Sequence, residues 1–518
     1  MDRSKMISQL EDPSEVFDFL VIGGGATGIG IALDASTRGY RVALFEQSDF
    51  TKGTSSRSTK LVHGGVRYLA QGDVSLVLEA LRERGLLRQN APHLVKDQTF
   101  LIPCYRWWEG PFYTIGLILY DVMAGKLGLG RSVCIGPKRA LRTIPMLRPK
   151  GMTAGVLYHD GQFDDSRLAI NMVRSSIDAG ACILNYAKVI GLLKDGDHKV
   201  SGVTVRDEET GTVYQVRSRC VINATGVFAD EILQMDEPGK RPTVRPSQGV
   251  HLVLDSSFLQ SDCAIMIPKT SDGRVLFAVP WHDKVVVGTT DTLMESPEKE
   301  PVALEKEIQF ILDTAANYLT RPPKRSDVLS GLRPLAAPRS EGKKTKEISR
   351  SHKLIREKSG LITIIGGKWT TYRKMAQDTL DLAIRYMHIP TKDCITERYQ
   401  IHGSRKNPDF SDPLYVYGTD ADEIRNLVAS SPAMAEKLHP DYAYTVGEVT
   451  WLVRNEMPRT LEDVLARRLR ILFLDARAAM AMAPKVAGIL ATEWGKDETW
   501  TSAQVKAFNE VASNYILN

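Results

Sequence analysis

Three glycines near the N-terminus have the spacing of a turn that binds the phosphates of a nucleotide. Gly23, Gly25 and Gly28 match the pattern G-x-G-x-x-G. Glycine permits a tight turn and a close approach to a pyrophosphate, and a helix that begins there directs its N–H groups at the anion. Glu46 follows 18 residues after Gly28, near the position at which an acidic residue accepts ribose hydroxyls. The motif predicts a bound dinucleotide, either FAD or NAD. The contacts predicted in the turn are Gly23, Gly25, Ala26, Thr27 and Gly28.

The flanking sequence supplies the elements that must position this turn. Residues 17–22 (FDFLVI) are a short apolar run, typical of a buried parallel strand. Residues 28–37 are rich in small side chains and predict a helix, and residues 41–45 (RVALF) predict a second strand. A strand, a helix and a strand within about 30 residues have the size of one half of a dinucleotide-binding domain.

Residues 55–69 (SSRSTKLVHGGVRYL) combine hydroxyls, cations and glycines without helical or alternating periodicity. A loop that wraps around a phosphate-containing ligand needs these residue types, whereas the alternative is a solvated surface loop. The predicted cofactor contacts in and next to this segment are Thr54, Ser55, Ser58, Thr59, Lys60, His63, Gly64 and Gly65.

Two later segments have the same form, an apolar strand that runs into a glycine turn. Residues 221–226 (VINATG) resemble the second nucleotide contact of many FAD enzymes, which favours FAD over NAD. Residues 366–373 (GGKWTTYR) would place the N-terminus of a helix where it stabilises negative charge on a reduced flavin. The predicted cofactor contacts here are Ala224, Thr225, Gly226, Gly367, Lys368, Trp369 and Thr370.

Composition limits the class of protein. The chain has 518 residues, of which 43% are hydrophobic and 25% charged, as in ordinary globular proteins. Six widely spaced cysteines form no C-x-x-C pair, so we expect reduced thiols and no metal site. The net charge of +5 fits anionic substrates or a membrane surface, and no basic stripe indicates a nucleic-acid partner. The N-terminus lacks the apolar core of a signal peptide.

The pattern of elements predicts an α/β protein in which a Rossmann-like FAD-binding domain is interrupted by a β-rich substrate domain and followed by a helical domain. The FAD-binding domain would be discontinuous within residues 1–390. Its predicted pieces are residues 1–75, 155–240 and 330–385, with insertions at 76–154 and 241–329 and a C-terminal α-helical domain at 391–518. In the helical domain, Thr460 and Asp463 form a weak capping box before an apolar stripe. Residues 340–346 predict a solvated charged loop, with a mobile lid as the alternative.

Together these motifs resemble the FAD-dependent glycerol-3-phosphate dehydrogenases of the respiratory, quinone-reducing type. HGGVRYL and GGKWTTYR are specific to that family, and the other glycine motifs are shared with many FAD oxidoreductases. The segments that carry the resemblance are GGGATGIG at 23–30, STKLVHGGVRYL at 58–69, INATGVFAD at 222–230, GTTDT at 288–292, GLRPL at 331–335 and GGKWTTYR at 366–373.

The resemblance implies that FAD takes a hydride from sn-glycerol 3-phosphate and that the electrons pass to a membrane quinone. A phosphate dianion requires cations at its site. The substrate-binding residues implied by motif position are Arg67, Tyr68, Arg333, Lys368 and Thr370, and the catalytic ones are His251, Arg333 and Lys368. We expect His251 to accept the hydroxyl proton, with His63 as the alternative, although a lone histidine in a strand is more often a core residue.

Residues 106–126 (RWWEGPFYTIGLILYDVMAGK) have apolar side chains at helical spacing, aromatic residues at one end and basic flanks. Such a helix suits the plane of a bilayer interface, whereas the alternative is an ordinary core helix. Because the family must reach a lipid-soluble quinone, we expect peripheral or monotopic attachment to a lipid surface, on the cytoplasmic side of the inner or plasma membrane. A homodimer is one option for the oligomeric state.

Three other functions remain open from the sequence. An amino-acid or amine oxidase of the same flavin fold could use an arginine to bind a carboxylate instead of a phosphate. A glycerophosphate oxidase would pass the electrons to oxygen, but those proteins usually carry an insertion that this chain lacks. A non-catalytic or RNA-associated flavoprotein has no support in the charge pattern.

Overall fold

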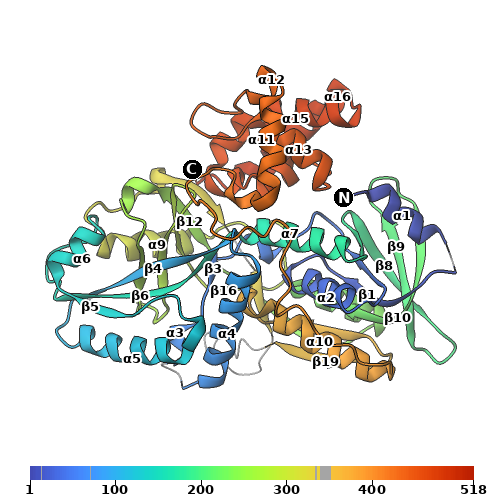
Figure 1. Cartoon of the computed structure of the whole chain (residues 1–518), viewed down its shortest axis with the longest axis horizontal. Coiled ribbons are helices and arrows are strands. Elements are labelled where there is room, and N and C mark those ends of the chain that lie inside the picture. The colour runs from blue at the N-terminus through green and yellow to red at the C-terminus, as the bar shows by residue number, and fades with distance from the viewer. Residues whose placement is uncertain (13, 70–71, 333–334, 339–351, 518) are drawn as a thin grey trace.

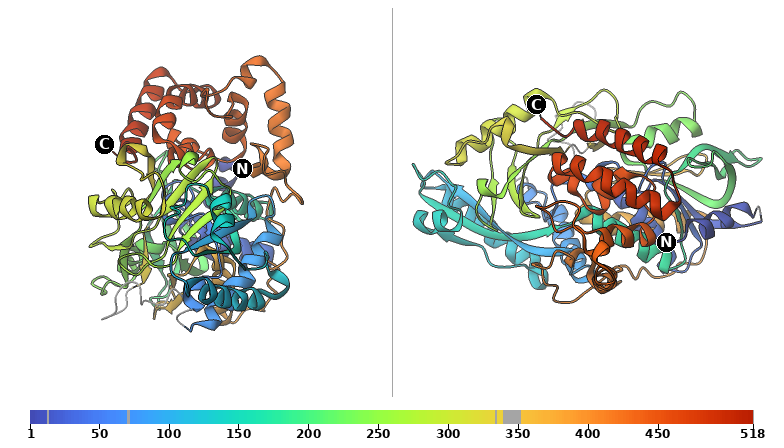
Figure 2. Two further views of the ribbon diagram at one scale, coloured as in Figure 1. Left: turned by 90° about the vertical axis from the view of Figure 1, so that its left-hand side faces the viewer. Right: turned by 90° about the horizontal axis from the view of Figure 1, so that it is seen from above.

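The computed structural model describes residues 1–12, 14–69, 72–332, 335–338 and 352–517. Two parts built around β-sheets lie side by side, and the C-terminal helices lie over the junction between them (Figures 1 and 2). The fold confirms the predicted class, an α/β FAD-binding fold followed by a helical C-terminal domain.

The first sheet holds the predicted nucleotide-binding strands. Its strand order is β19-β20-β10-β1-β2-β7, and the strands from β20 to β7 are parallel. The strands are β1 (Val16–Ile22), β2 (Val42–Phe45), β7 (Cys182–Leu184), β10 (Val213–Asn223), β20 (Ile362–Ile365) and the antiparallel edge strand β19 (Lys353–Arg356). The hairpin of β8 (Ala187–Lys194) and β9 (Val200–Asp207) continues from β10. Apolar residues on both faces explain why these strands read as continuous hydrophobic runs.

Three helices cover one face of this sheet, namely α2 (Ala26–Thr37), α7 (Asp165–Asp178) and α10 (Tyr372–Met387). The N-terminal helix α1 (Arg3–Glu11) packs with the opposite face. Gly30 of α2 explains the close packing, because a Cβ there would lie 2.9 Å from the ring of Tyr372 in α10. Two helices that are far apart in the chain are therefore held against the strands that lead into the glycine turns.

The second sheet is mainly antiparallel and has the strand order β17-β12-β15-β14-β13-β4-β6-β3, with β5 beside β6. The strands are β3 (Leu61–Val62), β4 (Val95–Cys104), β5 (Val133–Ile135), β6 (Ala154–Phe163), β12 (His251–Asp255), β13 (Ala264–Ile267), β14 (Leu276–Trp281), β15 (Lys284–Gly288) and β17 (Val328–Leu332). β6 lies in this sheet, although most of its residues fall in a segment predicted for the FAD-binding domain. The physical reason is that β6 pairs with β4 along its whole length.

Helices cover both faces of the second sheet. The helices α6 (Pro137–Thr143) and α9 (Glu305–Tyr318) pack on one face, and α5 (Glu109–Ala124) packs on the other, next to α4 (Val74–Asn90). A small third sheet consists of β16 (Thr292–Leu293), β11 (Val244–Gln248) and β18 (Leu335–Pro338). The short helix α3 (Val66–Leu69) lies next to α4 and α5, whereas α8 (Ala229–Asp236) packs with the first sheet, on the face that α1 also covers.

The C-terminal helices follow a stretch without regular secondary structure. No helix or strand occupies residues 391–414, because this stretch is rich in the turn residues Pro, Gly, Asn, Asp and Ser. The helices are α11 (Ala421–Ala429), α12 (Pro432–Ala435), α13 (Val446–Asn455), a π-helical turn (Asp463–Arg468), α14 (Ile471–Leu474), α15 (Ala476–Trp494) and α16 (Glu498–Ser513). The apolar stripe predicted after Thr460 is buried, but it is divided at Arg470, whose φ is 63°.

Candidate functional site

A cavity of about 460 Å³ opens where the strands of the first sheet end. The turns after β1, β10 and β20 all line it, and His251 of the second sheet faces it from the other side. Ligands of open parallel sheets bind at the carboxyl ends of the strands. Segments predicted separately from the sequence therefore meet at one site. The predicted residues that line the cavity are Gly23, Gly25, Ala26, Thr27, Glu46, Thr54, Ser55, Ser58, Thr59, His63, Ala224, Thr225, Gly226, His251, Gly367, Lys368, Trp369 and Thr370.

The first glycine turn is closed so tightly that larger side chains are excluded. Gly23 has a φ of 109°, and a Cβ there would lie 2.8 Å from the carbonyl oxygen of Ala224. A Cβ at Gly28 would lie 1.9 Å from the carbonyl oxygen of Gly23. Gly25 is the N-cap of α2 and has no side chain that could cap the helix. Gly25, Ala26 and Thr27 all line the cavity, so the N-terminus of this helix faces it. This arrangement fits the pyrophosphate of FAD.

Glu46 lies at the end of β2 and is fixed by backbone donors. Its Oε2 accepts a hydrogen bond from Gly24 N at 2.7 Å, and its Oε1 accepts one from Ser48 N at 2.9 Å. Burial raises the pKa of the Glu46 carboxyl above its usual range, against these two hydrogen bonds. Lys188 and Val189 of β8 also line the cavity. The position fits a carboxylate that accepts ribose hydroxyls.

The segment that begins with η1 (Thr54–Ser56) is joined to the GGKWTTYR turn by two hydrogen bonds. The indole Nε1 of Trp369 donates to the carbonyl oxygen of Ser55 at 2.8 Å, and the backbone N–H of His63 donates to Thr370 Oγ1 at 3.2 Å. Ser55 Oγ also accepts from Ala26 N at 3.0 Å, at the start of α2. Three predicted cofactor segments are thus tied together by hydrogen bonds.

His251 is 1% exposed and occupies the first position of β12. Its Nε2 lies 2.9 Å from Thr59 Oγ1, within hydrogen-bonding distance. Burial, assisted by the positive charge of Lys60, lowers the pKa of His251 to about 3. The imidazole is therefore neutral near pH 7, which is the form that accepts a proton.

Four residues predicted to bind the cofactor do not line the cavity, namely Gly28, Lys60, Gly64 and Gly65. Lys60 is instead buried, and its Nζ donates to Asp165 Oδ1 and to the carbonyl oxygen of Ser56, both at 2.6 Å. Gly64 N donates to the hydroxyl of Tyr120 at 2.7 Å. Lys60 and Gly64 thus anchor the segment that lines the cavity without lining it themselves.

Several predicted residues lie outside what the structure describes. Arg333 lies outside the described residues, as does the charged loop 340–346. For Arg67 and Tyr68 the backbone is described as part of α3, and the side chains are not. Their roles at the site remain predictions.

Other lining residues were not predicted from the sequence. They include Lys52, Lys188, Thr290, Asp291 and Lys299. Thr290 has a clear structural role, since its Oγ1 accepts from Val250 N at 2.9 Å and donates to Glu307 Oε1 at 3.0 Å. The GTTDT segment contains Thr290 and Asp291 and was a usable signal, whereas Lys52 and Lys299 belong to no motif.

Comparison with known proteins identifies the family. The family described as FAD dependent oxidoreductase matches residues 18–373, and the C-terminal domain of alpha-glycerophosphate oxidase matches residues 361–501. The mitochondrial glycerol-3-phosphate dehydrogenase of Mesocricetus auratus is 38% identical over 559 residues, covering 99% of this chain and 75% of that protein. The corresponding protein of Schizosaccharomyces pombe is 37% identical, covering 99% of this chain and 89% of that protein. The chain belongs to the FAD-dependent glycerol-3-phosphate dehydrogenase family. This confirms the resemblance inferred from the motifs.

Solved structures agree with this family. The glycerol-3-phosphate dehydrogenase of Bacillus halodurans complexed with FAD has a TM-score of 0.81 and 28% identity, covering 99% of this chain and 97% of that one. The L-alpha-glycerophosphate oxidase of Mycoplasma pneumoniae, with a TM-score of 0.57 and 15% identity, covers 74% of this chain and 98% of that one, and shows a shared fold. As a glycerol-3-phosphate dehydrogenase family member, the chain uses FAD, as predicted, and not NAD.

Proposed function

We propose that this protein oxidises sn-glycerol 3-phosphate to dihydroxyacetone phosphate and passes the electrons to a membrane quinone. The observation that carries the proposal is the meeting of a neutral, buried His251 with Lys368 and Thr370 in the cavity formed by the FAD-binding turns. A base for the substrate hydroxyl and a cation for its phosphate thus face one cavity.

The bound FAD supplies a two-electron acceptor for the hydride that leaves C2 of the substrate. The chain supplies the other groups. His251 accepts the proton of the C2 hydroxyl, which requires a neutral imidazole. Lys368 holds the phosphate and Thr370 donates a hydrogen bond to the substrate. Arg67 and Arg333, assigned by motif position, are the further phosphate-binding cations of this proposal.

The exposed face of α5 supports attachment to a membrane surface. Phe112 is 60% exposed, Ile115 71% and Val122 71%, and Trp107, just before the helix, is 83% exposed. The helix α5 lies along the edge of the molecule opposite the C-terminal helices (Figure 1). An amphipathic helix with aromatic residues at one end suits a bilayer interface, from which a lipid-soluble quinone is accessible. Among the described residues, no helix is both long and apolar enough to cross a bilayer.

The decisive experiment is an anaerobic titration of the purified yellow protein with sn-glycerol 3-phosphate. We expect prompt bleaching of the flavin absorbance and one dihydroxyacetone phosphate per flavin. Reoxidation by a quinone analogue and by oxygen is then compared, because fast reoxidation by oxygen would instead identify a glycerophosphate oxidase. A flavin that bleaches with amino acids or amines and not with glycerol 3-phosphate would overturn the proposal.

A further inference from the structure

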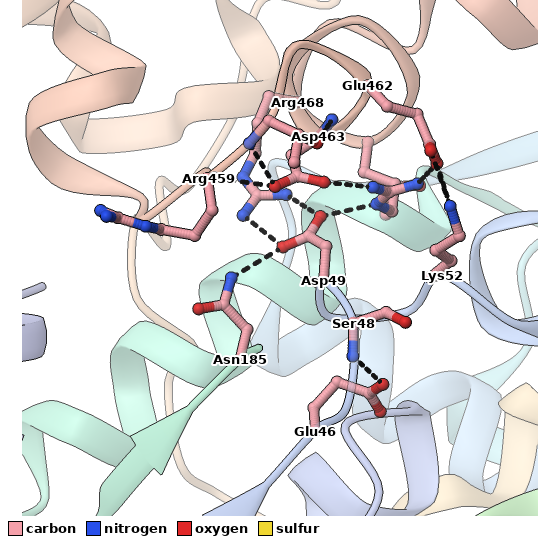
Figure 3. Close-up of polar contacts among 12 residues, drawn as sticks. Glu46, Ser48, Asp49, Lys52, Asn185, Arg459, Glu462, Asp463 and Arg468 are labelled. Atoms are coloured by element: carbon pink, nitrogen blue, oxygen red, sulfur yellow. Dashed lines mark hydrogen bonds and ion pairs between the residues drawn. The ribbon is translucent and has the colours of Figure 1, made fainter. Parts of the chain in front are cut away.

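A buried cluster of charges joins the C-terminal helical domain to the loop that follows β2 (Figure 3). Asp49 of this loop is completely buried and accepts from two consecutive arginines of the π-helical turn. Arg467 Nε donates to Asp49 Oδ2 at 2.6 Å, and Arg468 donates to both carboxylate oxygens at 2.7 and 3.0 Å. Asn185 Nδ2 donates to Oδ1 at 3.1 Å. The carboxylate is thus bound by side chains from segments about 135 and 420 residues away along the chain.

A second contact ties the same loop to the same helical turn. Lys52 Nζ donates to Glu462 at 2.6 Å, and Arg467 Nη1 donates to Glu462 Oε1 at 2.7 Å. Arg467 Nη2 also donates to Asp463 Oδ1 at 2.6 Å. Three carboxylates, those of Asp49, Glu462 and Asp463, therefore face two arginines and one lysine. Lys52 and Arg468 also lie near the carboxylates of Glu300 and Glu456, at 3.4 and 3.7 Å. Removing the charge of Asp49 leaves two buried arginines without part of their compensation.

The loop held by this cluster is part of the wall of the FAD cavity. Glu46, Ser48, Thr51 and Lys52 line the cavity on either side of Asp49, which itself does not. Thr51 has a φ of 61°, a conformation that is unfavourable for a residue with a branched Cβ. Its backbone N–H donates to the carbonyl oxygen of Gly24 in the glycine turn. A conformation of this kind persists where the surrounding structure imposes it, and Asp49, two residues before Thr51, is held by the charge cluster.

We propose that Asp49, Arg467 and Arg468 form a clamp through which the C-terminal domain holds the loop 46–55 in its FAD-binding conformation. They are positioning residues, because they act through Glu46, Ser48 and Thr51. The helical domain is then required for retention of the cofactor, although the clamp residues do not line the cavity. The inference rests on the proposed function only in taking FAD as the ligand.

The test compares two isosteric variants of the full chain, Asp49→Asn and Asp34→Asn. Asp34 is the matched control, because it is also completely buried and is bound by two donors of one arginine, Arg38, at 3.0 and 2.6 Å, but both residues lie at the end of α2 and neither lines the cavity. Both variants lose one buried carboxylate charge. Dissociation of FAD is measured by flavin fluorescence after stripping and titration, together with the thermal unfolding temperature.

We expect Asp49→Asn to raise the dissociation constant of FAD by about tenfold or more, a usual size for coupling between sites. Asp34→Asn should also lower the unfolding temperature, because it leaves a buried arginine without its carboxylate, and should leave the dissociation constant of FAD within about twofold of the wild type. Hydrogen exchange of the apoprotein supplies a readout that does not need FAD, and we expect faster exchange in residues 46–55 of Asp49→Asn alone.

Equal FAD affinity in the wild type and Asp49→Asn would overturn the clamp, and so would equal losses in both variants. If Asp49→Asn does not fold, Glu462→Gln replaces it, since Glu462 keeps slight exposure and binds both Lys52 and Arg467. We then expect a several-fold rise in the FAD dissociation constant, and an unchanged one rejects the clamp. A wild-type chain that takes up no FAD rejects the proposed function, while unchanged exchange in residues 46–55 rejects the clamp independently.

Discussion

The hydroxyl oxygen of Thr59 lies 2.9 Å from Nε2 of His251, and the two residues come from segments 192 positions apart. The other ring nitrogen, Nδ1, is buried and has no hydrogen-bond partner among the described residues. Thr59 is therefore the side chain that fixes the orientation of the imidazole. Ser58 and Lys60, on either side of Thr59, are both anchored to Asp165 at the start of α7.

Replacement of Thr59 by valine should slow substrate oxidation by about tenfold or more, because the imidazole loses the group that orients it. Thr59→Ser retains the hydroxyl and should preserve most of the rate. The measurement is the anaerobic rate of flavin bleaching in stopped flow, with FAD content determined for each variant because Thr59 lines the FAD cavity. Equal rates in Thr59→Val and the wild type would remove Thr59 from the mechanism.

The pH dependence of bleaching should show no break near 6.5 that belongs to His251. Burial lowers its pKa to about 3, so the base is already deprotonated throughout the neutral pH range, and its contribution to the rate should fall only as pH approaches 3. His251→Gln should slow bleaching by about 10²- to 10⁴-fold at all pH values. A break near 6.5 that disappears in His251→Gln would contradict the buried, neutral imidazole.

Charged residues on the exposed face of α5 should release the protein from vesicles. The double variant Ile115→Glu/Val122→Glu changes two side chains that are each 71% exposed, so the fold should be unaffected. We expect loss of co-sedimentation with lipid vesicles and unchanged anaerobic bleaching. The control is Ile190→Glu/Val213→Glu, which changes exposed residues of β8 and β10 in the other sheet. Equal sedimentation of the two double variants would place the membrane contact elsewhere.

His402 should stabilise the fold more at pH 6 than at pH 9. Its Nδ1 lies 2.9 Å from Asp178 of α7 and its Nε2 lies 3.1 Å from Asp420, which also pairs with Arg174. Burial opposes protonation, but the carboxylates outweigh it and raise the pKa of His402. A raised folded-state pKa stabilises the protein below the unfolded value of about 6.5, and this contribution is lost as pH rises through the folded-state pKa.

The corresponding variant, His402→Gln, should lose on the order of 1 kcal/mol at pH 6 and less at pH 9. Thermal unfolding midpoints at the two pH values provide the measurement. His388→Asn is the control, since His388 is exposed, forms no ion pair that the described structure shows, and has a left-handed backbone conformation that asparagine tolerates. A loss that grows from pH 6 to pH 9 would show that the imidazolium does not stabilise this contact.

Local patterns in the sequence were sufficient for the glycine turns. The strand before Gly23 and the helix after it are encoded within a few residues, so they were predictable, as was the turn at Gly367. His251 could be named only through the resemblance to a family, because a histidine at the start of a strand has no local signature. Lys60 was assigned to the cofactor by its position in a motif, whereas its partner Asp165 lies 105 residues away. The pairing of Lys52 with Glu462 spans 410 residues and leaves no periodic signal in either segment.

The order of the strands in the first sheet has a consequence for the folding of the protein during its synthesis on the ribosome. β1 lies between β2 and β10, and β20, which leads into the last of the turns predicted to bind the flavin, pairs with β10 from about 140 residues further along the chain. The pocket for the flavin is therefore incomplete until the residues after β20 have been synthesised, and the arginines that hold Asp49 emerge about 100 residues later still. Cofactor loading is consequently a late step in biogenesis, and a nascent chain that stalls before this point exposes an unfinished sheet.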